Sequence, residues 1–180
     1  ASRLIKKFAG LSRLILENST KSLVTADREW KALKLYTELE AMRYSDSFTY
    51  SFNVDENLQL QHILLPPMLI QPLIENAILH GLIVEPKPDS HLEVSLAQIE
   101  NGICITVSDN GVGVSDKVKT PTQKMLKQQS IGISSIKERL EMINAQTKSD
   151  MGKLTITPGP NNRGTIAKIC LPLLNQNQMA

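Results

Sequence analysis

The sequence predicts an α/β protein in which a sheet with further helices follows an N-terminal helical segment. Three observations predict this class. In residues 1–46, apolar residues recur at three- and four-residue spacing, which is the period of a helix. From residue 47 the period changes to two in several stretches, which is the period of a strand. Between two of these stretches stands Asn101-Gly102, a strong signal for a hairpin turn.

The first 46 residues predict two helices. Ser2 is placed to cap the first helix, and Asp27 offers an N-cap for the second. The apolar stripe of the first helix consists of Leu4, Ile5, Phe8, Leu11 and Ile15. Packing on the rest of the chain explains such a stripe, and for the first helix a contact with a second copy of the chain stays open as well.

The remaining elements follow from period and punctuation. The expected strands are residues 48–54, 92–96, 103–107, 153–157 and 165–171. A third helix is expected to open at Pro66-Pro67 and end near Gly81, and a fourth to run over 132–145. The stretch between 113 and 130 lacks apolar periodicity, so we expect a mobile linker. Its lysines are Lys117, Lys119, Lys124 and Lys127.

Composition limits the classes of protein that fit. The 180 residues are 41% hydrophobic and 21% charged, as in a soluble globular domain with an appendage. A net charge of +2 gives no argument for nucleic acid or for a membrane surface. The most apolar stretch, 63–74, contains prolines and is too short to span a bilayer. Cys104 and Cys170, in apolar strand-like runs, are interpreted as reduced thiols in a cytoplasmic setting.

One polar constellation lies in the third expected helix. Asn76 and His80 are four residues apart and therefore share a helix face, with Glu75 about one position round. An amide oxygen can bind Mg²⁺, which takes substrate phosphates and waters as further ligands. For either residue alone, a merely polar helix face explains the pattern as well.

A second constellation, Asp109-Asn110-Gly111-Val112-Gly113, ends a strand expected to be buried. A carboxylate there needs a hydrogen-bond donor, and the exocyclic amino group of adenine is one. The glycines allow a sharp turn and the close approach of a flat base. An ordinary strand-ending turn is the alternative. The sequence contains neither a Gly-Lys-Ser/Thr phosphate loop nor the dinucleotide glycine pattern.

Taken in order, these segments resemble the GHKL ATP-binding superfamily. Residues 75–81 are similar to its N box, 109–113 to its first glycine box and 130–140 to its second, and Gly164-Thr165 to its late Gly-Thr pair. Residues 39–44 and 66–76 resemble LytS-type sensor histidine kinases in particular. The resemblance implies a two-layer sandwich of the Bergerat type, a mixed sheet with helices on one face.

The resemblance also implies ATP and Mg²⁺ and a role for individual residues. Asn76 would hold Mg²⁺, His80 would face the phosphates, and Asp109 would accept from the adenine amino group. Gly132 would be a lid hinge at the N-terminus of the fourth helix, and Glu75 would assist proton removal unless it is only a surface carboxylate. The remaining implied contacts of ATP are Gly111, Gly113, Ile133 and Thr165.

Departures from the family pattern keep alternatives open. Leu79 stands where many members carry Lys, and Ser130 replaces a glycine of the second box. Pro72 stands where the ATPase branch has its water-activating Glu, which argues against vigorous hydrolysis. An ATP-binding pseudokinase or interaction module, and another GHKL ATPase, remain the alternatives.

The resemblance implies a place in a longer protein. Residues 1–46 would end a dimerisation and phosphotransfer region, 47–174 would be the catalytic domain and 175–180 a tail. The γ-phosphoryl group would pass to a histidine outside this chain, since neither His62 nor His91 sits in a phosphoacceptor context. A response regulator, of the LytTR type by analogy, would receive it. The longer protein would be a homodimeric bacterial membrane sensor, with this domain in the cytoplasm and attached to the membrane only through upstream segments.

Overall fold

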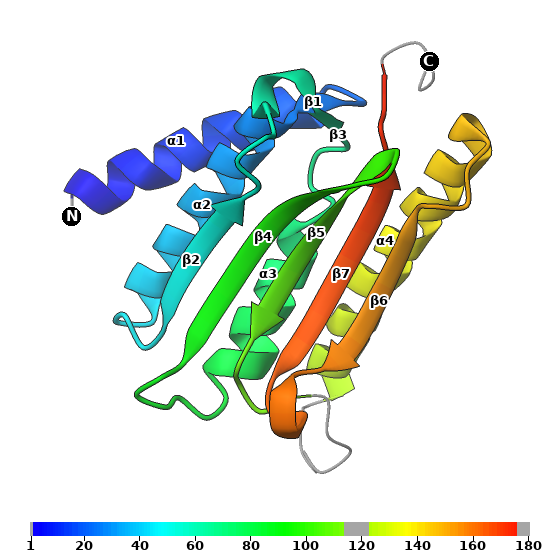
Figure 1. The fold of residues 1–180 in the computed structure, drawn as a ribbon. Helices are drawn as coiled ribbons and strands as arrows, with labels where there is room; N and C mark the ends of the chain where they lie inside the picture. The colour runs from blue at the N-terminus through cyan, green and yellow to red at the C-terminus, as the bar shows by residue number, and fades with distance from the viewer. Residues whose placement is uncertain (1, 114–122, 176–180) are drawn as a thin grey trace.

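The computed structural model describes residues 2–113 and 123–175 of the chain, and side chains for 2–113 and 131–175 (Figure 1). The helices are α1 (Ser2–Ser19), α2 (Ala26–Arg43), α3 (Gln71–Asn76) and α4 (Gln123–Thr147), with a π-helical segment η2 (Ala77–Leu82) and the 3-10 turns η1 (Leu60–His62) and η3 (Pro160–Asn162). The strands are β1 (Val24–Thr25), β2 (Thr49–Val54), β3 (Leu64–Leu65), β4 (His91–Ile99), β5 (Gly102–Asp109), β6 (Lys153–Pro158) and β7 (Thr165–Pro172).

Five strands form one mixed sheet in the order β2-β4-β5-β7-β6. β2 runs parallel to β4, and the other neighbours are antiparallel. The predicted hairpin is confirmed, because β4 and β5 pair from Ile99 opposite Gly102, and Asn101 has a φ of 61° in the turn. β1 and β3 form a separate two-stranded pair that the sequence did not predict.

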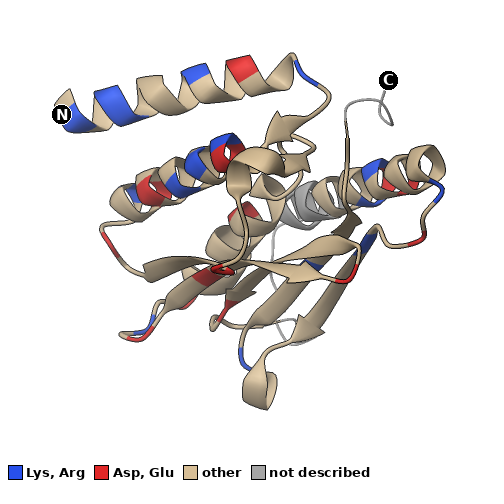
Figure 2. Cartoon of the chain, turned by 45° about the horizontal axis from the view of Figure 1, so that its top comes forward, with Lys and Arg blue, Asp and Glu red and all other residues tan. Residues whose placement is uncertain are grey.

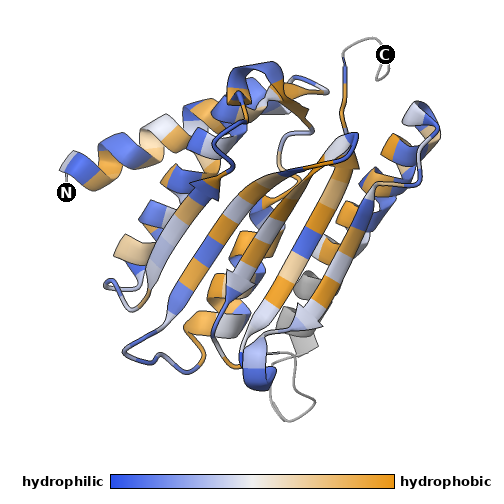
Figure 3. Cartoon of the chain, in the orientation of Figure 1, coloured by the Kyte–Doolittle hydropathy of each residue, from blue (hydrophilic) through white to orange (hydrophobic). Residues whose placement is uncertain are grey.

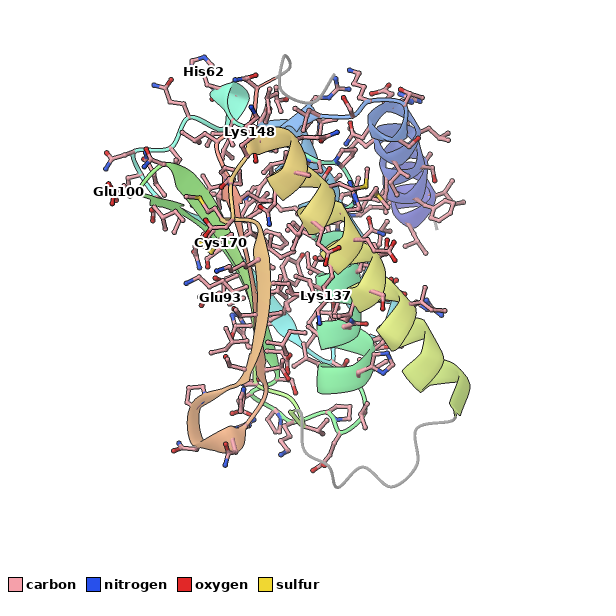
Figure 4. The ribbon with its side chains drawn as sticks, turned by 90° about the vertical axis from the view of Figure 1, so that its right-hand side faces the viewer. His62, Glu93, Glu100, Lys137, Lys148 and Cys170 are labelled. Carbon is pink, nitrogen blue, oxygen red and sulfur yellow. A yellow bond between two sulfur atoms is a disulfide. The ribbon has the colours of Figure 1, made fainter. Side chains whose placement is uncertain are left out.

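The helices cover one face of the sheet and leave the other open (Figures 1 and 4). Apolar and polar residues alternate along the central strands (Figure 3), and the apolar set points into the layer between sheet and helices. This core includes Leu33, Ile74, Ile78, Leu92, Val94, Ile105, Ile136, Leu140 and Ile169. The predicted two-layer α/β sandwich is confirmed.

The N-terminal helices pack in two ways. Trp30 and Leu33 of α2 belong to the main core, and the Trp30 ring stands edge-on to Phe52 of β2 at 5.4 Å. α1 packs on α2 through a smaller cluster around Leu11, and Lys7 forms an ion pair with Glu38 at 2.7 Å. Figure 2 shows charged residues along both helices. In the part of the chain that the structure describes, no helix combines the length and apolar character needed to cross a membrane.

The starts of α2 and α3 differ from prediction. α2 begins at Ala26 with Thr25 as its N-cap, so Asp27 lies inside the first turn, where a carboxylate favours the helix dipole. α3 begins at Gln71 and not at Pro66-Pro67, because Met68 has a φ of 63° and is left-handed. The helix then changes from α to π at residue 77.

The prediction of two reduced thiols is wrong in this structure. Cys104 and Cys170 are joined by a disulfide on the open face of the sheet. The reason is register: β5 and β7 place the two residues directly opposite one another, with Cα atoms 4.1 Å apart. Composition does not reveal the strand register, so the two cysteines give no support for a cytoplasmic setting.

Candidate functional site

A cavity of about 420 Å³ lies between the sheet and the helices, at the end of the layer where β5 ends and β7 begins. Its floor comes from β5, β6 and β7, and its walls come from α3, η2 and α4. The size falls in the range of small-molecule sites. The lining residues are Leu73, Asn76, Ala77, His80, Gly81, Val107, Asp109, Gly113, Ile133, Ser134, Lys137, Ile156, Thr165 and Ala167.

The structure brings most of the residues implied by the resemblance to this cavity. Those that line it are Asn76, His80, Asp109, Gly113, Ile133 and Thr165. Gly111 lies just behind the wall, against the backbone of Gly81. Glu75 is exposed and does not line the cavity. Burial is the main cause that raises the pKa of Glu40 on α2, and the charge of Glu75 raises it further. Glu75 therefore stands on the α2 side of α3.

Asp109 is a buried carboxylate with vacant acceptor capacity toward the cavity. Its side chain accepts the backbone N–H of Gly111 at 2.9 Å, and the residue is only 6% exposed. Burial raises its pKa to about 6, and backbone hydrogen bonds from Gly111 and Thr165 partly offset that rise. A carboxylate has about four acceptor sites, so this oxygen pair still has room for a ligand donor.

The binding of an adenine base should therefore depend on pH. If ionised Asp109 accepts from the amino group, affinity for adenosine is expected to rise about tenfold per pH unit up to about 6, the pKa to which burial raises Asp109, and to level off above it. The stability of the free chain has the opposite pH dependence. The folded state binds this proton more tightly than the unfolded state, so stability is lost as pH rises from 3.8 toward 6. Calorimetric titration with adenosine, which has no titrating phosphate, measures the pH dependence of the affinity. A flat profile from pH 5 to 7 contradicts it.

Gly81 fits because the Asp109 carboxylate approaches it closely. A Cβ at residue 81 would lie 2.7 Å from Asp109 Oδ1. Gly81 ends the segment that resembles the N box, and the sequence alone indicates no role for it. Its requirement is tertiary, since Asp109 is far along the chain and only the fold brings the two together.

The π-helical segment places His80 and Gly81 along the cavity wall after Asn76 ends α3. π-helical turns are frequently found at functional sites. Burial lowers the pKa of His80, with the charge of Glu75 acting in the opposite direction. The imidazole is therefore neutral at pH 7 and keeps one N–H to donate.

A polar network supports the loop that follows Asp109. Both terminal nitrogens of Arg163 donate to the Asp89 carboxylate, at 2.8 and 3.0 Å, and Arg163 Nε donates to the backbone oxygen of Asn110 at 2.9 Å. The Asn110 side chain donates to the backbone oxygen of Asp89 and accepts the N–H of His91. These bonds fix the loop after β5, and none of Asp89, Asn110 and Arg163 lines the cavity.

Gly132 is not at a helix N-terminus, so that part of the hinge prediction is wrong. α4 begins at Gln123, nine residues earlier, and Gly132 lies within the helix beside Pro72. The four linker lysines and Ser130 lie outside the residues whose side chains the structure describes.

Gly132→Ala is accordingly expected to stabilise the chain. An added Cβ would lie 3.8 Å from Pro72 Cβ, an ordinary contact, and Ala is favoured over Gly inside a helix by about 0.5–1 kcal/mol. Urea unfolding should show this gain, with nucleotide affinity unchanged. Reduced affinity in a folded variant would restore the hinge hypothesis.

Lys137 is the cavity residue that the sequence reasoning missed. It follows Ile133 by one helical turn on α4, so helix spacing alone places both on one face. Figure 4 labels Lys137 on α4 alongside α3 and η2. Leu79, where the family pattern has Lys, does not line the cavity, and Lys137 supplies a cation from another element.

The residues present fit ATP and Mg²⁺. The cavity combines the buried Asp109 acceptor with apolar walls for a base, and Asn76, His80 and Lys137 lie on the helical side. Among the described residues no group of three or more His, Cys, Asp and Glu comes together as in a site built from side chains alone. Mg²⁺ does not need such a group, because it keeps several waters and takes phosphate oxygens as ligands. One amide oxygen from the protein therefore suffices.

Comparisons with known proteins agree with this geometry. The sequence model of the family described as histidine kinase-, DNA gyrase B-, and HSP90-like ATPase matches residues 65–175. The chain is 32% identical over 155 residues to the sensor histidine kinase/phosphatase LytS of Staphylococcus aureus, covering 85% of this chain and 25% of that protein. It is 30% identical over 116 residues to the sensor protein LytS of Staphylococcus haemolyticus, covering 64% of this chain and 19% of that protein.

A solved structure shows the same fold. The histidine kinase domain of the blue-light activated histidine kinase from Erythrobacter litoralis EL346 superposes with a TM-score of 0.63 at 14% identity, covering 99% of this chain and 84% of that one. The chain spans only about a fifth to a quarter of the length of the two LytS relatives.

Proposed function

Because the chain belongs to the histidine kinase-, DNA gyrase B- and HSP90-like ATPase family, we propose that it binds Mg-ATP in the cavity as the catalytic part of a LytS-type sensor histidine kinase. The observation that carries this is Asp109, a buried carboxylate at the floor of a pocket in which the apolar Val107, Ile133 and Ala167 also take part. Backbone N–H groups of Gly111 and Thr165 take up part of its acceptor capacity, and the adenine amino group is a donor that can take up more of it.

Each end of the cavity has its own task in this proposal. Asp109 and Thr165 hold the adenine, between the apolar side chains of Ile133 and Ala167. On the helical side, His80 and cationic Lys137 face the phosphates. Asn76 holds Mg²⁺, which when bound offsets phosphate charge and orients the terminal phosphoryl group. Gly111 and Gly113 shape the loop under the base.

In the proposed reaction the γ-phosphoryl group passes to a histidine outside residues 1–180. The bond from γ-phosphorus to the bridging oxygen breaks, a phosphorus–nitrogen bond forms, and ADP and the imidazole proton leave. Catalysis of this transfer rests on positioning and on offsetting charge. Glu75 is exposed on the α2 side of α3, so the accepting histidine would approach it from that side.

The longer protein is proposed to pass the group to a response regulator, of the LytTR type, and to be a homodimeric membrane sensor with this domain in the cytoplasm. The dimer is supported by α1, which exposes an apolar surface: Leu4, Ile5, Phe8 and Leu16. Residues 1–46 would belong to the dimerisation and phosphotransfer region and 47–174 to the catalytic domain, although Trp30 of α2 packs in the main core.

Nucleotide titration of the chain tests the proposal. We expect ATP analogues to bind in the presence of Mg²⁺, and Lys137→Met to weaken ATP by about 5- to 20-fold, because one charge-assisted contact is lost. Adenosine affinity should be unchanged by Lys137→Met, and Lys148→Met, just beyond the C-terminal end of α4, is the matched control. Equal losses for ATP and adenosine would contradict the phosphate role of Lys137. Absence of any nucleotide binding would overturn the function.

Incubation with radiolabelled ATP separates the proposed kinase from its alternatives. The chain alone should not label itself, and the longer protein should carry an acid-labile label. Rapid release of inorganic phosphate would favour an ATPase. Nucleotide binding without any labelling of the longer protein would favour a pseudokinase.

A further inference from the structure

One peptide unit, between Pro67 and Met68, is hydrogen-bonded from two different helices. Arg139 Nη2 of α4 donates to the backbone oxygen of Pro67 at 2.7 Å. The backbone N–H of Met68 donates to Glu29 Oε1 of α2 at 3.1 Å. Glu29 of α2 and Arg139 of α4 therefore form hydrogen bonds on opposite sides of the same peptide. We call these two hydrogen bonds the grip.

The Glu29 side chain is buried, and the Arg139 side chain is half-buried. Glu29 is 2% exposed, and burial raises its pKa, while the Met68 N–H and the charge of Arg139 act in the opposite direction. Burial lowers the pKa of Arg139, and Glu29 offsets part of that effect. A buried charge that lost its partner would be strongly unfavourable, so the two side chains and the peptide stabilise one another.

The gripped peptide is also in a conformation that needs support. Met68 has a φ of 63°, a left-handed conformation that costs a non-glycine residue roughly 1–2 kcal/mol. Conformations of this kind persist where the surroundings hold them, and they gather at functional sites. Further bonds tie the same segment to the start of α2: Ala26 N donates to the Ile63 oxygen at 2.8 Å, and Val24 pairs with Leu65.

The three elements that meet here have different tasks in the proposed reaction. The gripped segment leads directly into α3, which carries Asn76. α4 carries Ile133 and Lys137 into the cavity, and Arg139 is two residues beyond Lys137. α2 packs with α1 in the N-terminal helical segment, and the acceptor histidine would approach the cavity from the side of these helices.

We propose that Glu29 and Arg139 are positioning residues that hold α2 in a fixed place relative to the nucleotide cavity, through the Pro67–Met68 peptide. The inference rests on the proposed function and deepens it. The grip sets the direction in which the phosphoryl group leaves the cavity. Loss of the grip therefore slows transfer and leaves the nucleotide contacts in place.

The test uses the longer protein with its acceptor histidine. Glu29→Leu and Arg139→Met remove the hydrogen bonds, Glu29→Gln and Arg139→Lys keep an acceptor and a donor, and Asp27→Asn is an exposed control on the same helix. We expect the first two variants to bind nucleotide within about threefold of the unmodified protein but to transfer about 10- to 100-fold more slowly, as misplacement of a reactant does. The conservative variants should recover most of the rate.

Wild-type rates in Glu29→Leu and Arg139→Met would overturn the inference. So would parallel losses of affinity and rate, which would mean that the pair shapes the pocket. A second measurement does not depend on transfer: hydrogen exchange of the 180-residue chain. Nucleotide should protect α2 amides in the unmodified chain and fail to do so in the two hydrogen-bond-deleting variants. If the unmodified longer protein binds nucleotide and transfers nothing, the proposed function fails, and the exchange experiment still decides on the grip.

Discussion

Asp109→Asn is expected to lower the affinity for ATP by about 100-fold or more. The ionised carboxylate is replaced by an amide, so a hydrogen bond to a charged acceptor, about 1.5–3 kcal/mol, is lost. The amide that remains also turns a donor or a weaker acceptor toward the adenine amino group. Because the site excludes water, the unmatched groups add a further penalty. Titration with a fluorescent nucleotide measures the loss.

The same substitution is expected to leave the free chain at least as stable as before. Burial raises the pKa of Asp109 to about 6, so at pH 7 the ionised group disfavours folding, by about 1–3 kcal/mol. Asparagine has no charge, and its Oδ1 can keep the Gly111 N–H that Asp109 accepts at 2.9 Å. Urea unfolding of the nucleotide-free chain should show equal or greater stability.

Asp150→Asn, at an exposed position after α4, is the matched control and should change neither quantity. Unchanged nucleotide affinity in Asp109→Asn would refute the adenine role. A strongly destabilised variant would mean that the carboxylate serves the fold and not a ligand.

Local patterns predicted the elements that depend on local chemistry. Asn101-Gly102 gave the hairpin because both residues tolerate the turn conformation, and alternation placed β2, β6 and β7 within a few residues. The period of residues 132–145 gave only the second part of α4, since its first turns have no apolar periodicity.

The errors arose where distant parts of the chain decide the outcome. Pro66-Pro67 suits a first helical turn, yet Glu29 and Arg139 hold the next peptide in a turn and delay α3 to Gln71. The disulfide between Cys104 and Cys170 depends on register, which no local pattern contains. The parallel pairing of β2 with β4 is likewise a long-range property.

The candidate site shows the same division. Asp109 was found because a carboxylate at the end of an apolar strand conflicts with local expectation, and such conflicts mark functional positions. Lys137 carried no such signal, because an exposed lysine on a helix is ordinary. Gly81 could be assigned a role only when the fold placed the Asp109 carboxylate against it.

Gly111→Ala should have the second large effect, which comes from a clash with the backbone and not from the loss of a functional group. A Cβ at residue 111 would collide with the backbone oxygen and carbon of Gly81 in η2. Neither atom can turn aside as a side chain can. The loop after β5 would have to move away from η2, although Val112 N donates to the Gly81 oxygen at 3.2 Å.

The expected loss of stability is about 2–4 kcal/mol, from overpacking and from two weakened hydrogen bonds. One joins Val112 N to the Gly81 oxygen, and the other joins Gly111 N to the Asp109 carboxylate. Nucleotide affinity should fall with it, because the Gly111 N–H helps to orient the Asp109 carboxylate. Urea unfolding and nucleotide titration measure the two losses, with Gly132→Ala as the glycine control that gains stability. Wild-type affinity in a folded Gly111→Ala chain would show that the loop reaches the same geometry without contact to Gly81. Asp109 would then be held by β5 and the Arg163 network alone, and the glycine would serve only the path of the chain.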